Sequence, residues 1–538
     1  MVAQGEVAPY AIAHDLHGTT ETSQRWKPAI AALVPAAVAG VLAVTAVVLG
    51  WRGSDLPAHF FRVGLVERDG LKVWNNYWFG GHHTLGYGVL FPLLGALVGI
   101  WTVAVASAAV LAALVDVLIR GATGRRNWWA SLWFAAGTVT NVAVGRLPFA
   151  LGMTIALGTL VAVQRRRFVV ATLLAVLTAV ASPVVSLFLT LIFSAWSLTT
   201  NGGESRKFAA LGAVAIGPVI VISLMYPQGG MFPFRWSALV WTVVACAAVL
   251  VLVPAEQHLV RCTAVLYGLA SVAAFVVPTP VGANITRLGM YAAGPVLLVL
   301  APVRRLIWAA VFGGVLWWQW SPAFDAIFRA RDDPSTEAVF YHPLVNYLIS
   351  VGADNARVEV VPTGRHWETA YVATHVPIAR GWERQIDRRF NPLFYEDGLT
   401  DAELHRWLRE SGVRYVALGN TTLDDSAVEE AALLEAGPSY LRHVWGNDDW
   451  RVWQVVDSPG LVDGPARLAE LGTDTITLQV LAPGDVLVRV HASAFWTSDP
   501  PVCIEPTADD WIVLRDVRPG SVEISLDEGE LVDADDPC

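Results

Sequence analysis

The first three-fifths of this chain is a series of long apolar segments joined by short polar connections, and this pattern restricts the fold more than any other feature. Leu, Ile, Val, Ala, Phe and Trp fill roughly eleven such segments, and a helix of about 20 apolar residues can cross a bilayer. Several segments have only about 15 residues, so we expect tilted, broken or re-entrant helices among them. The segments are residues 28–50, 89–119, 128–144, 147–163, 168–182, 184–198, 208–226, 237–254, 263–277, 292–303 and 306–318.

The composition divides the chain into a membrane part and a water-exposed part. Hydrophobic residues make up 54% of the 538 residues, which is more than soluble domains of ordinary composition contain. Residues 321–538 hold 17 Arg, no Lys and 38 acidic residues, whereas the whole chain has a net charge of −10. The first 320 residues are therefore positively charged overall, as expected for the loops of a multi-span protein. Arg outnumbers Lys by 34 to 3, which is typical of a GC-rich bacterial gene.

The positions of Arg and Lys predict the orientation of the spans. If the polar residues 1–27 form a cytoplasmic tail, every short basic cluster falls on the cytoplasmic side. The loop 51–88 and everything after Trp320 then lie outside, in a multi-pass plasma-membrane protein. Residues 1–27 have no signal-peptide pattern, so the first span is expected to be an uncleaved anchor. The basic clusters are Arg120 with Arg125 and Arg126; Arg165, Arg166 and Arg167; Arg206 with Lys207; Arg261; and Arg304 with Arg305.

The predicted fold is an α-helical polytopic membrane domain (28–320), followed by an extracytoplasmic α/β unit and a C-terminal β-sandwich. Strand-like and helical stretches alternate over residues 321–456, whereas residues 457–538 contain short strands with turn residues between them. Cys503 and Cys538 both fall outside, where they can form a disulfide or stay free. In the long loop 51–88, residues 56–66 have the apolar spacing of an amphipathic helix.

Carboxylates are scarce in the membrane part, which limits where chemistry could occur. Only nine occur in the first 320 residues, and none falls in the middle of a predicted span. This pattern counts against proton- or sodium-coupled transport, which places ionisable groups inside the bundle. Asp55 directly follows the first span and is the predicted catalytic residue, although it could instead be only the N-cap of the next helix. Glu67 and Asp69 fit a solvated helix end better.

Basic and imidazole side chains on the same predicted face could bind a phosphate. Arg146 lies in a tight connection between two spans, and Arg287 lies in the turn PTPVGANITRL. A guanidinium stays charged and can donate two parallel N–H hydrogen bonds, which suits the oxygens of a phosphate diester. Each Arg could instead contact lipid headgroups. His59, His82 and His83 could form a metal site, but their spacing does not require one, and no metal is predicted.

In the water-exposed half, residues 364–387 combine aromatic rings with charged side chains. Aromatic platforms beside polar groups are typical of sugar binding, because ring faces stack while hydroxyls form hydrogen bonds. A structural ion-pair network inside a small domain explains the same residues equally well. The candidate substrate contacts in this run are His366, Trp367, Glu368 and Arg384.

The order of these features resembles the GT-C superfamily of integral-membrane glycosyltransferases, which take sugars from polyprenyl-phosphate carriers. The matching segments are SDLPAHFFR after the first span, YWFGGHHTLGYGVLFP before the second, GRLPF, PTPVGANITRL and the extracytoplasmic C-terminal part. The resemblance implies that Asp55 is the catalytic base or a carboxylate near the reaction centre. Many members have two adjacent acids where this chain has Ser54 and Asp55, so a divalent cation is compatible with the loop but not indicated, and no other cofactor is implied. The terminal β-rich segment resembles a carbohydrate-binding sandwich.

The resemblance also implies the substrates. The donor would be a polyprenyl-phosphate-linked sugar and the acceptor a cell-envelope glycan or glycolipid, with membrane lipids around the protein and no nucleic acid. Asp55 would act as general base in an inverting transfer. Two other classes stay open, namely an exporter or flippase of a lipid or glycan and a non-catalytic membrane protein that binds envelope glycan. The implied donor-phosphate residues are Arg146, Arg287, His82 and His83, and the implied substrate contacts are His59, Trp78, Tyr87, Asn284, His366, Trp367, Glu368 and Arg384.

Overall fold

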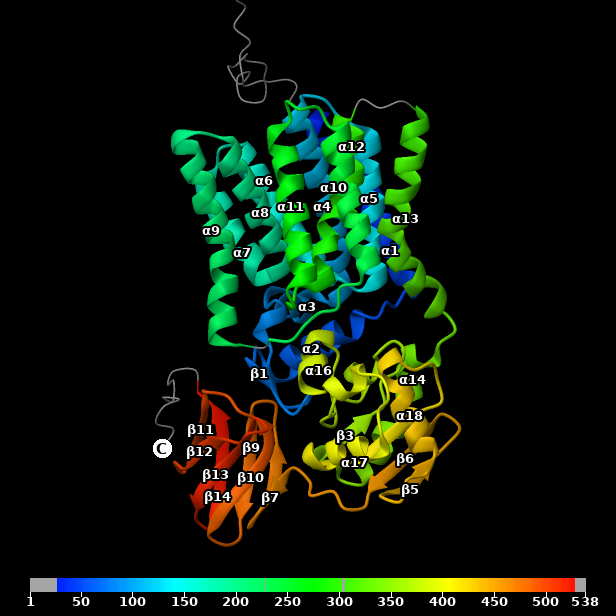
Figure 1. The fold of residues 1–538 in the computed structure, drawn as a ribbon, viewed down its shortest axis with the longest axis vertical. Helices are drawn as coiled ribbons and strands as arrows, with labels where there is room; N and C mark the ends of the chain where they lie inside the picture. The colour runs from blue at the N-terminus through cyan, green and yellow to red at the C-terminus, as the bar shows by residue number, and fades with distance from the viewer. Residues whose placement is uncertain (1–26, 228, 302–304, 528–538) are drawn as a thin grey trace, which may run out of the picture.

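The computed structural model describes residues 27–227, 229–301 and 305–527, which form a helical bundle with two smaller domains at one end (Figure 1). The bundle fills the upper part of the view in Figure 1, and an α/β domain (residues 334–455) and a β domain (residues 462–526) lie below it. Helices α2 (Leu56–Asp69) and α3 (Leu90–Val98) lie between the bundle and these domains. The predicted tail 1–27 falls almost entirely outside the described residues.

The bundle consists of apolar helices that run in alternating directions. Among the described residues, five helical segments are long and apolar enough to cross a membrane, and four shorter apolar helices accompany them, which indicates a membrane protein. In sequence order, the bundle helices are α1 (Lys27–Val48), α4 (Ile100–Thr123), α5 (Trp128–Val144), α6 (Leu147–Gln164), α7 (Phe168–Ala181), α8 (Pro183–Thr199), α9 (Gly202–Met225), α10 (Trp236–Leu252), α11 (His258–Val276), α12 (Arg287–Leu300) and α13 (Arg305–Arg329).

Several predicted segments differ from the helices in their boundaries: α9 and α11 begin earlier than expected, α13 continues to Arg329 instead of ending near residue 318, and two further differences affect the site. Residues 89–119, expected as one segment, are split into α3 and α4 at Gly99. The φ of Gly99 is +89°, a backbone conformation that residues with a side chain rarely adopt. The segment expected at 292–303 begins earlier, at Arg287, because the 3-10 turn η2 (Gly282–Thr286) leads directly into α12. These two differences matter for the site, because Arg287 becomes the first residue of a helix.

The loop between α1 and α3 is ordered and packs against both smaller domains. The predicted amphipathic helix is α2, which is followed by a two-stranded hairpin of β1 (Trp74–Asn75) and β2 (His82–His83) and by the turn η1 (Leu85–Tyr87). Trp78 belongs to a hydrophobic cluster shared with the α/β domain, whereas Trp74 belongs to the cluster inside the β domain. The loop therefore joins the bundle to both domains by apolar burial.

The α/β domain is built on a four-stranded mixed sheet in the order β3-β4-β6-β5. Only β3 and β4 are parallel; the other neighbours are antiparallel. Helix α17 shows a capping box, in which Thr400 and Glu403 satisfy each other's backbone N–H groups. The elements are η3 (Pro334–Thr336), α14 (Ala338–Ser350), η4 (Ala353–Asn355), β3 (Arg357–Val360), α15 (Glu368–Tyr371), α16 (Arg384–Phe390), η5 (Pro392–Tyr395), α17 (Asp401–Glu410), β4 (Val413–Gly419), η6 (Asp425–Ala427), α18 (Val428–Glu435), β5 (Leu441–Gly446) and β6 (Trp450–Val455).

The β domain contains two four-stranded antiparallel sheets, in the orders β12-β13-β10-β7 and β11-β14-β9-β8. Side chains from both sheets enter one hydrophobic cluster, for example Leu478 of β9 and Leu514 of β13. Cys503 is disulfide-bonded, and its predicted partner Cys538 lies outside the described residues. The strands are β7 (Val462–Asp463), β8 (Ala466–Leu471), β9 (Thr475–Val480), β10 (Gly484–His491), β11 (Trp496–Asp499), β12 (Cys503–Pro506), β13 (Trp511–Val517) and β14 (Gly520–Leu526).

A buried ion pair joins α2 to the α/β domain. The guanidinium of Arg62 donates to the carboxylate of Glu383, and the two side chains are only 5% and 2% exposed. Burial raises the pKa of Glu383, and the charge of Arg62 opposes this rise. Each partner thus compensates a charge that would otherwise be costly to bury.

The buried pair leads to a stability prediction. Arg62→Met should lower the free energy of unfolding by about 3–5 kcal/mol, because it leaves the Glu383 carboxylate buried without its cation. The double variant Arg62→Met/Glu383→Leu should recover much of that loss, because no charge is then left unpaired. Unfolding followed by intrinsic fluorescence in detergent measures both effects. Arg406→Met, at an exposed position of α17, serves as the control and should change stability by about 0.5 kcal/mol or less.

Candidate active site

Asp55, Arg146 and Arg287 lie together, although they come from three distant parts of the chain. Asp55 precedes α2, Arg146 precedes α6, and Arg287 begins α12. The Oδ2 atom of Asp55 lies 3.8 Å from Nε of Arg146 and 3.8 Å from Nη2 of Arg287. Both pairs of atoms are close enough for an ion pair but too far apart for a hydrogen bond. The carboxylate is therefore attracted by both guanidiniums without being locked to either.

Two glycines let the Asp55 loop approach the turn between α5 and α6. A Cβ atom on Gly53 would lie 2.4 Å from the backbone of Val144, and one on Gly145 would lie 2.5 Å from the backbone nitrogen of Leu56. Gly145 also has φ of +92°, at the end of α5. The N–H of Asp55 donates to the carbonyl of Val144 at 3.2 Å. Only glycine at both positions allows this contact, which sets the carboxylate beside Arg146.

The side chain of Asp55 does not cap helix α2. The residue does occupy the N-cap position of α2, but its side chain makes no capping hydrogen bond. Its Oδ1 atom is at the limit of contact with the Ser54 hydroxyl, at 3.5 Å, and Oδ2 faces the two arginines. A carboxylate that capped the helix would instead accept from a backbone N–H in the first turn. Asp55 is thus directed toward the cations.

Arg287 is positioned by a tight turn between α11 and α12. Gly282 in η2 has φ of +41°, and a Cβ atom there would lie 2.0 Å from the carbonyl oxygen of Phe232. The N–H of Phe232 donates to the carbonyl of Thr279, which joins the α9–α10 connection to the same turn. A positive side chain at a helix N-terminus is opposed by the helix dipole, so the nearby Asp55 carboxylate compensates an unfavourable position.

These three charged residues lie on the wall of a cavity of about 340 Å³. The rest of the lining comes mostly from the first turns of α10 and α12, from the middle of α13 and from η2, including the predicted contact Asn284. Trp241, Met290, Trp317 and Trp318 make one side of the cavity apolar. Trp317 is 59% exposed and Trp241 is 39% exposed on the surface of the helical bundle. The cavity therefore combines a charged end with an aromatic side that reaches the surface of the apolar helices.

The charged residues lining this cavity carry a net charge of +1. Two cations, Arg146 and Arg287, face the single anion Asp55, and the other lining residues are uncharged. Arg146 and Arg287 are 16% and 11% exposed, so water shields them only partly. An anionic group with one negative charge would balance the cavity, and the fork of each guanidinium can donate to phosphate oxygens.

His59 and Tyr87 lie near this cavity but do not line it. The ring of His59 contacts the rings of Tyr87 and Phe91, each at 5.6 Å between centroids. Burial, together with the charges of Arg62 and Arg287, lowers the pKa of His59 to about 3. Burial and the charge of Asp55 raise the pKa of Tyr87 to about 12. Both side chains are therefore neutral at physiological pH.

His82, His83 and Trp78 are placed elsewhere, in the core beneath the hairpin. Trp78 stacks on Phe61, and its indole N–H donates to the carbonyl of Thr369. Burial lowers the pKa of His82 to about 3 and that of His83 to about 4. None of these three residues lines the Asp55 cavity. Their predicted contacts with the donor phosphate or substrate would require another arrangement, and their observed role is packing.

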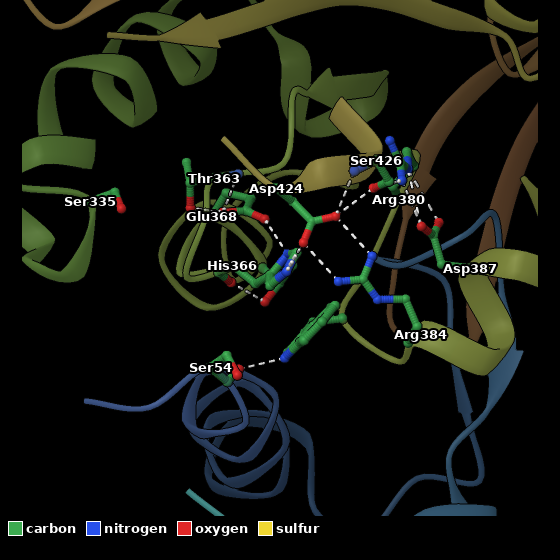
Figure 2. A network of polar contacts seen from close by, with 12 residues as sticks. Ser54, Ser335, Thr363, His366, Glu368, Arg380, Arg384, Asp387, Asp424 and Ser426 are labelled. Carbon is green, nitrogen blue, oxygen red and sulfur yellow. Dashed lines mark hydrogen bonds and ion pairs between the residues drawn. The ribbon is translucent and has the colours of Figure 1, made fainter. Parts of the chain in front are cut away.

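The candidates from residues 364–387 belong to a buried ion-pair network in the α/β domain, shown in Figure 2. Asp424 accepts from both nitrogens of the Arg384 fork at 2.8 and 2.7 Å, and it lies 3.2 Å from Nε2 of His366. Glu368 lies on the other side of the His366 ring, 3.4 Å from Nδ1. Burial opposes the charge of Asp424, but hydrogen bonds from Arg384 and His366 keep its pKa well below the usual range.

This network favours the structural interpretation of the run. His366, Trp367 and Glu368 are each less than 5% exposed, and none of them or Arg384 lines the Asp55 cavity. Although burial acts to lower the pKa of His366, hydrogen bonds to Asp424 and Glu368 raise it. The charged residues of this segment therefore pair with one another and with Asp424, whereas the indole N–H of Trp367 is buried without a hydrogen-bond partner.

Trp382 connects the network to Asp55, which the sequence did not predict. Its ring stacks on His366 at 3.4 Å between centroids, and the guanidinium of Arg384 lies 4.8 Å from the ring centroid. The indole N–H donates to the carbonyl of Ser54, the residue before Asp55. The α/β domain thus holds the loop that carries the candidate carboxylate.

Two residues that line the cavity, Trp241 and Trp318, were missed, and so was Arg62, which lies beyond the cavity lining. Arg62 lies seven residues after Asp55, two helical turns along α2, so the helical spacing could have identified it. Trp241 and Trp318 lie inside apolar segments, where the sequence carries no signal to separate cavity-lining tryptophans from lipid-facing ones. Within residues 27–227, 229–301 and 305–527, no three His, Cys, Asp or Glu side chains cluster like metal ligands.

The buried histidines predict how stability depends on pH. His59, His82 and His83 are neutral when folded, but in the unfolded chain they protonate near the ordinary pKa of 6.5. The unfolded state then binds more protons below that pH, so stability should fall as the pH drops from about 7.5 to about 5. Thermal unfolding across this range measures the loss, and His59→Asn should reduce it.

His366→Asn is the matched control for this prediction. The pKa of His366 is higher in the folded state than in the unfolded chain. His366 therefore contributes to stability at low pH, and this contribution disappears as the pH rises. Replacing His366 should therefore increase the stability that the protein loses when the pH drops. A wild-type protein whose stability is unchanged or rises below pH 6.5 would contradict the assignment of neutral, buried histidines.

Comparisons with known proteins assign no family to this chain. No protein-family model matches the chain, and no curated protein matches it. The chemistry of the site therefore has to follow from its own residues: one carboxylate, two guanidiniums and an aromatic wall at the end of an apolar helical bundle.

Proposed function

We propose that this protein is a membrane glycosyltransferase that moves a sugar from a polyprenyl-phosphate donor to a cell-envelope glycan or glycolipid. The single observation that carries the proposal is the cavity in which Asp55 faces Arg146 and Arg287 beside an aromatic wall. In this proposal the bundle crosses the plasma membrane with eleven spans, the site lies at the outer face, and the two sheets of the β domain form a sandwich.

The net charge and shape of the cavity support a lipid-linked phosphate as donor. A sugar phosphodiester carries one negative charge, which matches the excess charge of +1 on the lining residues. Its polyprenyl chain is apolar and could leave the cavity past Trp241 and Trp317, both of which are exposed on the bundle. Hydrocarbon along that surface would lie in the lipid, where it costs no exposure to water.

The reaction can be written with these residues alone. The acceptor hydroxyl oxygen attacks the anomeric carbon, its proton goes to the Asp55 carboxylate, and the bond between the anomeric carbon and the phosphate oxygen breaks. The phosphate changes from a diester with one negative charge to a monoester with up to two. Arg146 and Arg287 would stabilise the charge that develops on this leaving group. Attack opposite the leaving group inverts the anomeric centre.

Replacing the proposed base tests this mechanism. Asp55→Asn should lower kcat by a factor of about 10² to 10⁴, because the amide cannot accept the proton of the acceptor hydroxyl. The assay incubates the purified full-length protein with a panel of hexosyl and pentosyl polyprenyl phosphates and acceptor glycan, and measures which carrier is consumed. Glu67→Gln is the matched control, since Glu67 is an exposed carboxylate on the same helix α2.

The same assay distinguishes glycosyl transfer from both alternative functions. Neither an exporter or flippase nor a non-catalytic glycan-binding protein should consume carrier, whether as the wild type or as Asp55→Asn. If the wild-type protein consumes none of the carriers, or if Asp55→Asn is as active as the wild type, glycosyl transfer at Asp55 is excluded.

The contact from Trp382 predicts a positioning effect on the reaction. Trp382→Phe keeps the aromatic ring but removes the hydrogen bond to the Ser54 carbonyl, which frees the loop before Asp55. The expected result is a decrease of about 3- to 10-fold in kcat, the size of one hydrogen bond, with little change in the KM of the donor. Trp445→Phe, which keeps the stack on Tyr347 far from this loop, should leave kcat unchanged.

A further inference from the structure

A second cavity lies where the hairpin loop, the α/β domain and the β domain meet. Its volume is about 410 Å³, within the range of about 300–1,000 Å³ that is common for small-molecule sites. The lining includes Phe79 from the loop, Arg357 and Phe390 from the α/β domain, and His491 and Trp511 from the β domain. None of its lining residues belongs to the Asp55 cavity. The two cavities are therefore separate.

Aromatic rings form one side of this second cavity. The ring of His491 is stacked between Phe390, at 4.0 Å, and Trp511, at 4.4 Å between centroids. His491 itself is 6% exposed, whereas Phe390 and Trp511 are both partly exposed. The two outer rings thus present apolar surface to the cavity, which is the feature that a sugar ring needs for stacking.

Arg357 supplies hydrogen-bond donors at the buried end. Its side chain is 2% exposed, and two of its nitrogens donate to the carbonyls of Ser411 and Arg489. Its Nε atom is buried without a hydrogen-bond partner. The charged group that acts on this guanidinium is another cation, Arg489, and among the described residues no carboxylate forms an ion pair with it. Since a guanidinium has five N–H donors, Arg357 can donate to a further acceptor.

Carboxylates supply acceptors around the opening. Glu410 and Asp509 are exposed lining residues, and Asp510 lies 3.1 Å from Nδ1 of His491. These acids outnumber the lining cations Arg357 and Arg389, so the cavity opposes a negatively charged ligand. Donors at the bottom, acceptors at the opening and partly exposed rings between them suit a neutral molecule rich in hydroxyl groups.

We infer that this cavity at the junction of the three parts binds a neutral saccharide of one or two sugar units. The hydroxyls would donate to Glu410 and Asp509 and accept from Arg357, while the sugar faces pack against Trp511 and Phe390. This binding site goes beyond glycosyl transfer and does not require it, because it shares no residue with the Asp55 cavity. It would hold a glycan on the same side of the bundle as the candidate active site.

Ligand-observed saturation-transfer NMR on the full-length protein in nanodiscs tests the inference. The probes are maltose, xylobiose and α-1,6-mannobiose, with empty nanodiscs as background and with glucuronic acid and inorganic phosphate as anionic comparisons. At least one of the neutral disaccharides should bind, and it should bind more tightly than either anion. Asp55→Asn should bind it as well as the wild type does, which separates this result from the outcome of the transfer assay.

Two variants show whether binding occurs in this cavity. Trp511→Ala should weaken binding by about tenfold through the loss of ring stacking. Because Trp511 also packs on His491, the second variant is Glu410→Gln/Asp509→Asn, which changes only exposed residues and should weaken binding several-fold. Asp448→Asn, an exposed acid elsewhere in the α/β domain, should have no effect. The inference is overturned if no neutral disaccharide binds, if an anion binds more tightly, or if both cavity variants bind like the wild type.

Discussion

The close packing of the Asp55 loop against the turn between α5 and α6 is the contact on which the candidate site depends. Gly53 and Gly145 leave no space for a Cβ atom at this contact, and the backbone of Asp55 is hydrogen-bonded to Val144. The contact places one carboxylate beside Arg146, and Arg287 reaches the same point from the start of α12. Because opposite charges at partly buried positions attract strongly, this backbone contact also determines the electrostatics of the cavity.

The smaller domains support this arrangement rather than standing apart from it. Trp78 and Trp74 of the hairpin loop are buried in the clusters of the α/β domain and the β domain, respectively. The ion pair of Arg62 with Glu383 and the hydrogen bond of Trp382 to Ser54 then connect the α/β domain to both sides of Asp55. The network of His366, Asp424 and Arg384 keeps Trp382 in place (Figure 2). Movement of the domain would therefore be transmitted to the candidate base through a few defined contacts.

Much of the architecture could be predicted because it depends on local patterns. The length of the apolar segments predicted the bundle helices, the apolar spacing of residues 56–66 predicted α2, and turn residues predicted the strands of the C-terminal part. The convergence of Asp55, Arg146 and Arg287 was also expected, because each is polar and lies at the end of an apolar segment. The sequence did not indicate that His82, His83 and Trp78 are buried. Their burial depends on domains that follow them in the chain by hundreds of residues. The resemblance to the GT-C superfamily stays a prediction, as do the orientation in the membrane and the substrates.

By itself, the sequence determined that the chain has an apolar helical part and an acidic water-exposed part, and that very few carboxylates could serve a site at the bundle end. Hydrophobicity and charge are properties of each residue, so they can be read without knowing the fold. Only the tertiary structure decided that Asp55 faces two arginines instead of capping α2, that His366 and Arg384 pair with Asp424 in a buried network, and that a second cavity exists at the domain junction. These features depend on distances between segments far apart in the chain, which are set by packing and leave no local signal.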